Sequence, residues 1–203
     1  MSAAALAQRA GSPTGEAEDT VPVLVVGVGN EALGDEGVGV RVARALAGRD
    51  LPRDVRVLEG GTEGWALLGR LEGVRRLVLV DAMAMGRPPG TVVAVRLDQV
   101  RRAAPPERTS LHGVAILDVL ELASALGISP PEVYLVGIQP ARIAPGFGLS
   151  PEVERALPGA VEAAWKAAHG GWEQPAGPDG VTADARMFAE GERYGQAKAD
   201  TDR

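Results

Sequence analysis

The sequence contains no cysteine, few aromatic residues and no long hydrophobic run. The absence of cysteine among 203 residues excludes disulfides, thiolate metal sites and a cysteine nucleophile, and it agrees with a reducing compartment. Aromatic residues make up 3% of the chain, so the core must consist mainly of aliphatic side chains. The longest apolar runs, such as residues 21–28, are too short to span a bilayer, and residues 1–20 lack the apolar stretch of a secretory signal. We therefore expect a soluble, cytoplasmic protein without membrane association.

The sequence also lacks any cluster of basic residues. The net charge is -6, and the basic residues are scattered apart from two Arg-Arg pairs at 75–76 and 101–102. Binding to nucleic acid requires clustered Lys and Arg that neutralise phosphates. These features argue against nucleic acid as a partner. A large apolar surface stripe is also missing, which favours a monomer.

What is present is an alternation of apolar strand and helix patterns over one domain. Hydrophobic residues make up 45% of the chain, enough for a full core. Short apolar runs predict strands, and apolar residues at helical spacing predict helices between them. The expected strands are 23–26, 55–58, 77–80, 91–97 (antiparallel and at an edge) and 133–138, and the expected helices are 38–47, 62–71, 113–126 and 150–165. This alternation predicts an α/β fold with a mostly parallel sheet.

The boundaries of this domain follow from composition. Residues 21–169 form the predicted folded domain, residues 1–20 a flexible N-terminal extension, and residues 170–203 a disordered tail with a possible weak helix at 186–199. Inside the domain, residues 101–108 are expected to form a polar loop that contains prolines. Pro158 is expected to kink or interrupt the last helix, because proline removes a backbone hydrogen bond.

The loop after the first strand has two competing interpretations. Residues 27–32 (GVGNEA) match G-x-G-x-x-A directly after a strand, which is the pattern of a dinucleotide-binding site. However, Glu31, Asp35 and Glu36 follow in the same loop, and no basic residue occurs between the first strand and Arg41 to compensate their charge. Glu59 lies about 30 residues after Gly29, whereas the pattern places an acidic residue about 20 residues on. The acidic loop favours a cation, and a dinucleotide-binding module is the alternative.

Three potential metal ligands lie at one edge of the predicted sheet. Glu36 follows the first strand, Asp81 follows the third, and His112 precedes the helix that begins near Gly113. Loops at the carboxyl ends of parallel strands meet in one crevice, so these side chains are expected to converge. Two carboxylates and one imidazole suit Zn, Ni or a similar divalent ion and leave coordination positions open for catalysis.

Each of these residues also has a purely structural interpretation. Glu36 could be a solvated loop residue, Asp81 could cap the turn after its strand, and His112 could satisfy amides at the start of a helix. The other histidine, His169, lies near the end of the last helix, where a cationic side chain complements the helix dipole. Ser110 lacks the flanking glycines of a nucleophile elbow, so a serine hydrolase is not expected.

Beyond these patterns, several short segments resemble the hydrogenase maturation protease family, in its order and spacing. The matching segments are 25–30 (VVGVGN), 34–41 (GDEGVGVR), 59–62 (EGGT), 80–82 (VDA), 112–113 (HG), 117–120 (LDVL), 136–140 (VGIQP) and 148–151 (GLSP). Each is short, and together they cover nearly all of the domain at 21–169. The extension and the tail have no counterpart in the family pattern, and Glu59 replaces an Asp that is frequent in the family.

The resemblance implies a three-layer α/β sandwich with a mostly parallel five-stranded sheet. It implies an endopeptidase that removes the C-terminal extension of a nickel-iron hydrogenase large subunit after nickel insertion, with that precursor as its partner. The family's metal-contacting positions correspond to Glu36, Asp81 and His112, and Asp35 is a candidate supporting residue. The nickel is expected to come with the substrate, and Zn or Cd is expected to mimic it. A non-catalytic metal-binding accessory protein is the remaining alternative.

Overall fold

The computed structural model describes residues 22–62, 64–103, 111–129, 131–171 and 184–185. The predicted N-terminal extension, residues 1–20, lies outside these residues. In the described part of the chain, no helix combines the length and the hydrophobicity needed to cross a membrane.

A five-stranded sheet forms the centre of the molecule, in the order β2-β1-β3-β5-β4. Its strands are β1 (Val23–Val28), β2 (Val55–Gly61), β3 (Arg76–Ala82), β4 (Val92–Arg96) and β5 (Glu132–Ile138). All neighbouring strands are parallel except β4, which pairs antiparallel with β5 at the edge of the sheet. The predicted mostly parallel sheet, including its antiparallel edge strand, is confirmed.

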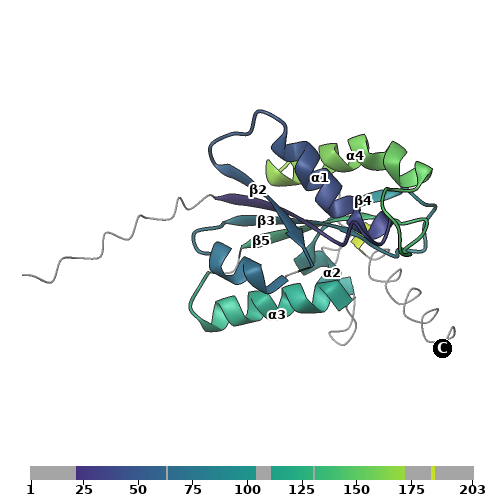
Figure 1. The fold of residues 1–203 in the computed structure, drawn as a ribbon. Helices are drawn as coiled ribbons and strands as arrows, with labels where there is room; N and C mark the ends of the chain where they lie inside the picture. The colour runs from purple at the N-terminus through teal and green to yellow at the C-terminus, as the bar shows by residue number, and fades with distance from the viewer. Residues whose placement is uncertain (1–21, 63, 104–110, 130, 172–183, 186–203) are drawn as a thin grey trace, which may run out of the picture.

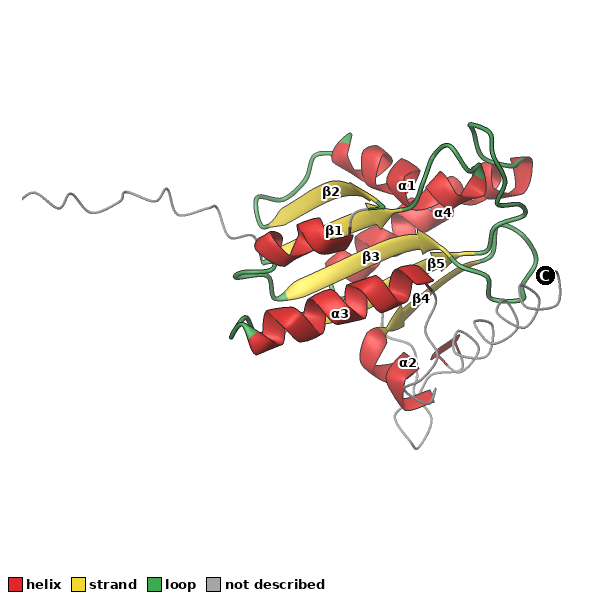
Figure 2. Cartoon of the chain, turned by 60° about the horizontal axis from the view of Figure 1, so that its bottom comes forward, coloured by secondary structure: helices red, strands yellow, loops and turns green. Residues whose placement is uncertain are grey.

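Helices cover both faces of the sheet, so the fold is the expected three-layer α/β sandwich (Figures 1 and 2). One face carries α1 (Val38–Ala47) and α4 (Pro151–Ala168), and the other carries the 3-10 helix η3 (Gly64–Arg70), α2 (Leu97–Ala103) and α3 (Leu111–Ala125). Side chains alternate along each strand, so each face of the sheet supplies its own hydrophobic cluster. Val25 and Val78 pack toward α1 and α4, whereas Leu24 and Leu77 pack on the opposite side.

Two local predictions on the η3/α2/α3 face of the sheet were wrong. The segment predicted as a loop from residue 101 begins inside α2, which ends at Ala103, shortly before Pro105. Leu97 and Val100 are three residues apart and buried, so packing against the sheet stabilises this short helix. The next helix, α3, begins at Leu111, two residues earlier than expected, which places His112 in its first turn. The rest of the predicted loop, residues 104–108, lies outside the described residues.

The last helix, α4, has its expected start and contains Pro158, where a kink or an interruption was expected. Ser150 caps its N-terminus by accepting a hydrogen bond from the backbone N–H of Val153, with Pro151 as the first helical residue, as expected. The helix is not interrupted at Pro158 and continues to Ala168. Pro158 is exposed, so water can satisfy the carbonyl that the missing N–H leaves on this side of the helix.

Little of the predicted disordered tail falls within the described residues. Asp184 and Ala185 are helical, and Ala185 is fully buried in the cluster beneath the sheet. At this point the chain therefore packs on the domain. The remainder of the tail, with the possible helix at 186–199, lies outside the described residues, so those parts of the prediction stay predictions.

Candidate metal-binding and catalytic site

The strand order places a topological switch point between β1 and β3. From β1 the chain continues to β2 on one side, and β3 then returns to the other side of β1. The loops that leave the carboxyl ends of two such strands diverge, which creates a crevice between them. Glu36 follows β1 and Asp81 lies at the end of β3, so both carboxylates come from the two strands that flank this crevice.

Glu36 lies in a short 3-10 helix, η2 (Asp35–Gly37), that folds back over the end of β1. Gly29 has a φ of +127°, and a Cβ at this position would overlap the carbonyl oxygen of Glu36. The loop can therefore close over the strand only because Gly29 has no side chain. The Glu36 side chain is half-buried, and its Oε2 atom is buried. The fold thus holds one carboxylate oxygen of Glu36 inside the loop cluster.

Asp81 lies within β3 rather than after it, one residue before the strand ends at Ala82. It is 7% exposed, one of two buried charged residues among those described. Its Oδ1 atom accepts a hydrogen bond from the backbone N–H of Ala82 at 2.7 Å, which orients the carboxylate at the end of the strand. Burying a carboxylate is costly unless it is compensated, so this position is unusual for a residue that only ends a strand.

His112 lies at the N-terminal end of α3, and its side chain is outside the described part of the structure. The C-terminal end of α3 leads into the start of β5, at the amino edge of the parallel strands. Fifteen residues of helix span about 22 Å, so the first turn of α3 lies toward the carboxyl edge, where Glu36 and Asp81 are. Figure 2 shows α3 along this face of the sheet.

The structure brings the elements that carry Glu36 and Asp81 into contact. η2 packs against β3, and a Cβ at Gly39, in the first turn of α1, would overlap the carbonyl oxygen of Val80, the residue before Asp81. Among side chains that the structure describes, no group of three or more His, Cys, Asp and Glu residues is positioned around a common metal site. Since the imidazole of His112 is not among them, the metal site of Glu36, Asp81 and His112 stays a prediction.

Asp35, the residue before Glu36, binds the loop before α4. It is 1% exposed and accepts hydrogen bonds from the backbone N–H groups of Ala141, Arg142 and Ser150 and from the Ser150 hydroxyl, at 2.6–3.1 Å. Burial alone would raise the pKa of Asp35, but these hydrogen bonds to the charged form outweigh burial and hold the pKa below its ordinary value. Asp35 therefore anchors the loop on which Glu36 lies.

A second group of charges borders the same loop, and sequence patterns alone did not reveal it. The guanidinium of Arg44 donates two hydrogen bonds to Glu31, at 2.9 and 3.0 Å, and two to Glu59, at 2.7 and 3.2 Å. Hydrogen bonding to Glu31 and then to Glu59 raises the pKa of Arg44, and the same contact lowers the pKa of Glu31. Glu31, one of the loop carboxylates that could repel a dinucleotide, is thus paired with a residue from α1, and so is Glu59.

Gln139 connects a third loop to this edge of the sheet. Its side-chain oxygen accepts hydrogen bonds from the backbone N–H groups of Met85 at 2.7 Å and Arg87 at 3.2 Å. Its backbone carbonyl accepts from Gly90 at 2.8 Å. Gln139 thus joins the loops after β3 and β5, and Asp35 joins the loop after β1 to the loop after β5. Gln139, although part of the 136–140 motif, was not singled out from sequence.

The geometry of Gly29 argues against the dinucleotide alternative. In that kind of site a glycine without a side chain lets a pyrophosphate approach the backbone at the start of a helix. Here the backbone of Glu36 occupies the space next to Gly29, and α1 begins only at Val38. The glycines of residues 27–32 serve close packing of the protein's own backbone.

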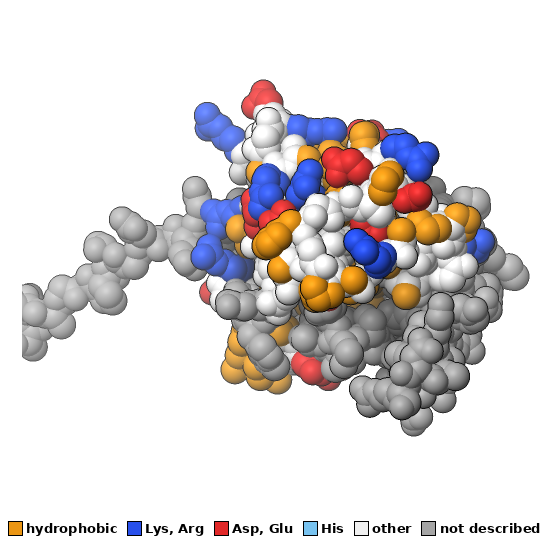
Figure 3. Space-filling model, turned by 45° about the vertical axis from the view of Figure 1, so that its right-hand side comes forward, with side chains coloured by type: hydrophobic (Ala, Val, Ile, Leu, Met, Phe, Trp, Pro, Cys, Tyr) orange, Lys and Arg blue, Asp and Glu red, His pale blue; other side chains and the backbone are white. Residues whose placement is uncertain are grey.

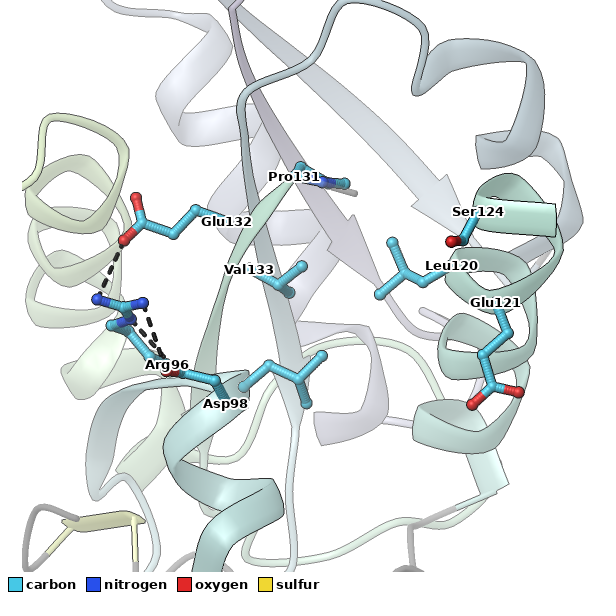
Figure 4. Close-up of a pocket in the computed structure, with 9 residues that line it drawn as sticks. Arg96, Asp98, Leu120, Glu121, Ser124, Pro131, Glu132 and Val133 are labelled. Carbon is cyan, nitrogen blue, oxygen red and sulfur yellow. Dashed lines mark hydrogen bonds and ion pairs between the residues drawn. The ribbon is translucent and has the colours of Figure 1, made fainter. Parts of the chain in front are cut away.

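A separate cavity of about 490 Å³ lies at the opposite edge of the sheet (Figure 4). Its lining includes Arg96, Asp98 and Glu132, and Arg96 contacts both acids, at 3.1 Å to Asp98 and 3.3 Å to Glu132. Arg96, Asp98 and Glu132 are therefore paired with one another. None of the three predicted site residues lines it.

Comparison with known proteins places this architecture among protein-processing enzymes. The model of the hydrogenase maturation protease family matches residues 40–167. The hydrogenase expression/formation protein HupD of Thiocapsa roseopersicina is 38% identical over 144 residues, which cover 70% of this chain and 65% of HupD. The hydrogenase 2 maturation protease of Escherichia coli is 38% identical over 142 residues, which cover 69% of this chain and 86% of that protein.

A solved structure of the same family has a similar fold. The hydrogenase maturating endopeptidase HybD from Escherichia coli superposes with a TM-score of 0.62 and 36% identity, over 70% of this chain and 88% of HybD. The matched part spans only 58% to 65% of the length of several HupD and HupM relatives.

Proposed function

Because the chain belongs to the hydrogenase maturation protease family, we propose that it is an endopeptidase that removes the C-terminal extension of a nickel-iron hydrogenase large subunit after nickel insertion. The observation that carries this proposal is the pair of carboxylates, Glu36 and Asp81, at the switch point between β1 and β3. Both lie in segments that match the family pattern, and both are withdrawn from solvent, Asp81 to 7% exposure.

The donor set suits the nickel of a loaded precursor. Two carboxylates and the imidazole of His112 would supply three ligand atoms and leave the remaining positions to the substrate. The three ligands come from three different segments of the chain, so the metal is engaged only when the loops are correctly folded. We propose that the protein uses this set to recognise a precursor that already carries nickel, and that Zn or Cd can occupy the same ligands.

The chain's own residues would orient the substrate and the attacking water. A bound nickel ion supplies Lewis acidity, which polarises the scissile carbonyl or activates a water. The hydrogen bond from Ala82 orients the Asp81 carboxylate, and Glu36 lies in η2 with its Oε2 atom buried. The Ser150 hydroxyl donates to Asp35 and caps α4, so this serine has a structural role and is not a nucleophile. We therefore propose hydrolysis without a covalent intermediate.

The decisive experiment is intact mass spectrometry of a purified large-subunit precursor. The precursor is incubated with and without nickel, and with and without this protein. The proposal predicts loss of a C-terminal peptide only when nickel and this protein are both present. Metal binding by this protein without any cleavage would instead support the non-catalytic metal-binding accessory protein.

The protein must act in the compartment in which the precursor is matured. Its cytoplasmic location and its monomeric state remain predictions from the sequence.

A further inference from the structure

The loop between β5 and α4 carries two large hydrophobic side chains on its outside. We call residues 141–149 the outer loop. Phe147 is 87% exposed and Ile143 is 52% exposed, and they are two of the four exposed large hydrophobic residues in the described part of the chain. Exposed hydrophobic surface on a folded protein often marks an interaction site.

The outer loop is held in place at both ends and in its middle. Asp35 accepts hydrogen bonds from Ala141 at its start and from Ser150 directly after its end. The backbone of Gly146 accepts a hydrogen bond from Gly34 at 2.8 Å and donates one to Ala32 at 2.9 Å. These contacts oppose collapse of the loop onto the domain, which would bury its hydrophobic side chains.

The local backbone turns Phe147 outward. It lies between Gly146, with a φ of +144°, and Gly148, with a φ of +91°. Non-glycine residues rarely adopt such angles, so the two glycines allow a sharp path that other residues would resist. A Cβ at either glycine would meet no atom within 4 Å, so the backbone angle, and not a close contact of a side chain, favours glycine at these two positions.

The outer loop also has a fixed position relative to the candidate site. Its partners, residues 32–35, lie immediately before Glu36 in the same loop. Figure 3 turns this side of the molecule forward, where hydrophobic side chains lie among white surface and charged side chains of both signs. A substrate that reaches Glu36 must therefore approach close to the outer loop.

We propose that Phe147 and Ile143 form a docking point for the folded part of the large-subunit precursor. This inference rests on the proposed function and deepens it. An extended peptide, such as the C-terminal extension alone, binds best in a groove, whereas side chains that protrude from a rigid loop fit a recess on a folded surface. The partner surface is therefore an apolar recess of the precursor, next to the segment that enters the site. Aromatic side chains of this kind often contribute a large part of the binding energy of an interface.

The test is steady-state cleavage of the nickel-loaded precursor by Phe147→Ser. We expect KM to rise roughly ten- to one-hundred-fold with kcat nearly unchanged, because the residue contacts the partner away from the reacting bond. Phe147→Leu should keep a KM close to that of the wild type. Leu126→Ser is the matched control, because Leu126 is 64% exposed but follows α3 at the opposite edge of the sheet, and its KM should not change.

The outcomes separate this inference from the proposed function. If the wild type does not cleave the precursor, the proposed function fails. If the wild type cleaves and Phe147→Ser has an unchanged KM, only the docking point fails. The docking point is also refuted if Phe147→Ser abolishes self-association of this chain without changing KM, or if it weakens binding of an isolated C-terminal extension peptide as much as binding of the precursor.

Discussion

The carboxylate of Asp35 accepts a hydrogen bond of 2.6 Å from the backbone N–H of Ser150, although 115 residues separate the two in the chain. Ser150 is also the N-cap of α4, so one buried carboxylate joins the loop after β1 to the start of the last helix. Asp35 and Glu36 are neighbours in sequence, but they have different roles. Asp35 fixes the border of the site, whereas Glu36 belongs to the proposed ligand set.

Removal of any proposed ligand should abolish cleavage without loss of folding. We expect Glu36→Gln, Asp81→Asn and His112→Ala to reduce cleavage at least about 100-fold, since loss of residues that merely support metal ligands already costs 10- to 100-fold. The amide variants keep the size of the side chain and remove its charge. Cleavage is followed by mass spectrometry, and folding by circular dichroism. Normal processing by His112→Ala would refute the assignment of this histidine.

Replacement of Asp35 by Asn should destabilise the protein. The variant keeps a similar shape but loses the charge that accepts hydrogen bonds from Ser150 and Arg142, so the free energy of unfolding should fall by about 1–3 kcal/mol. Urea denaturation measures this change. Asp98→Asn is the control, because Asp98 forms an exposed ion pair with Arg96, and its loss should cost less than about 1 kcal/mol. Equal stabilities of the two variants would contradict the anchoring role of Asp35.

Gly39 should not tolerate a side chain. A Cβ at this position would overlap the carbonyl oxygens of Val80 and Val28, which are backbone atoms of the sheet. We expect Gly39→Ala to lower the free energy of unfolding by about 3 kcal/mol or more, the upper range for overpacking. Gly48→Ala serves as control, since a Cβ at Gly48 would lie 3.6 Å from its nearest neighbour, the carbonyl oxygen of Ala45, and the φ of Gly48 is -78°. Thermal unfolding of both proteins provides the comparison, and a fully stable Gly39→Ala would show that α1 can move away from the sheet.

Glu132 should make a pH-dependent contribution to stability far from the site. Burial alone would raise its pKa, but the hydrogen bond and charge of Arg76, together with Arg96 and the Tyr134 hydroxyl, hold the pKa below the ordinary value of 4.5. The folded state therefore binds this proton less readily than the unfolded chain. The stabilisation is complete above pH 4.5 and is lost as the pH falls through the lower folded-state pKa.

The matching variant is Glu132→Gln. At pH 7 it should be less stable than the wild type by about 1 kcal/mol, because the side chain is 30% exposed and solvent weakens the ion pair. The difference should shrink in acid, where the wild-type carboxylate is protonated as well. Denaturation curves at several pH values measure it, and cleavage at pH 7 should be unchanged. A difference that stays constant down to pH 2 would show that the charge of Glu132 contributes nothing.

Local patterns were sufficient where the physical cause is local. Continuous apolar runs predicted the buried strands, and Ser150 with Pro151 predicted the start of α4, because capping depends on residues within one turn. They failed for α2, and the interruption that was one of two expected outcomes at Pro158 does not occur. Leu97 and Val100 form a helix because the sheet buries them, and α4 continues through Pro158 because this part of the helix faces water.

The sequence by itself determined the α/β fold, the edge of the sheet at which Glu36 and Asp81 lie, and the family pattern around them. Their order along the chain and the carboxyl ends of their strands are consequences of sequence patterning. Only the tertiary structure decided that Asp35 binds Ser150, that Arg44 joins Glu31 to Glu59, and that Phe147 stays exposed on an anchored loop. The reason is physical: hydrogen bonds between loops depend on which distant segments of the chain meet in the fold, and the spacing of residues within one segment does not reveal this.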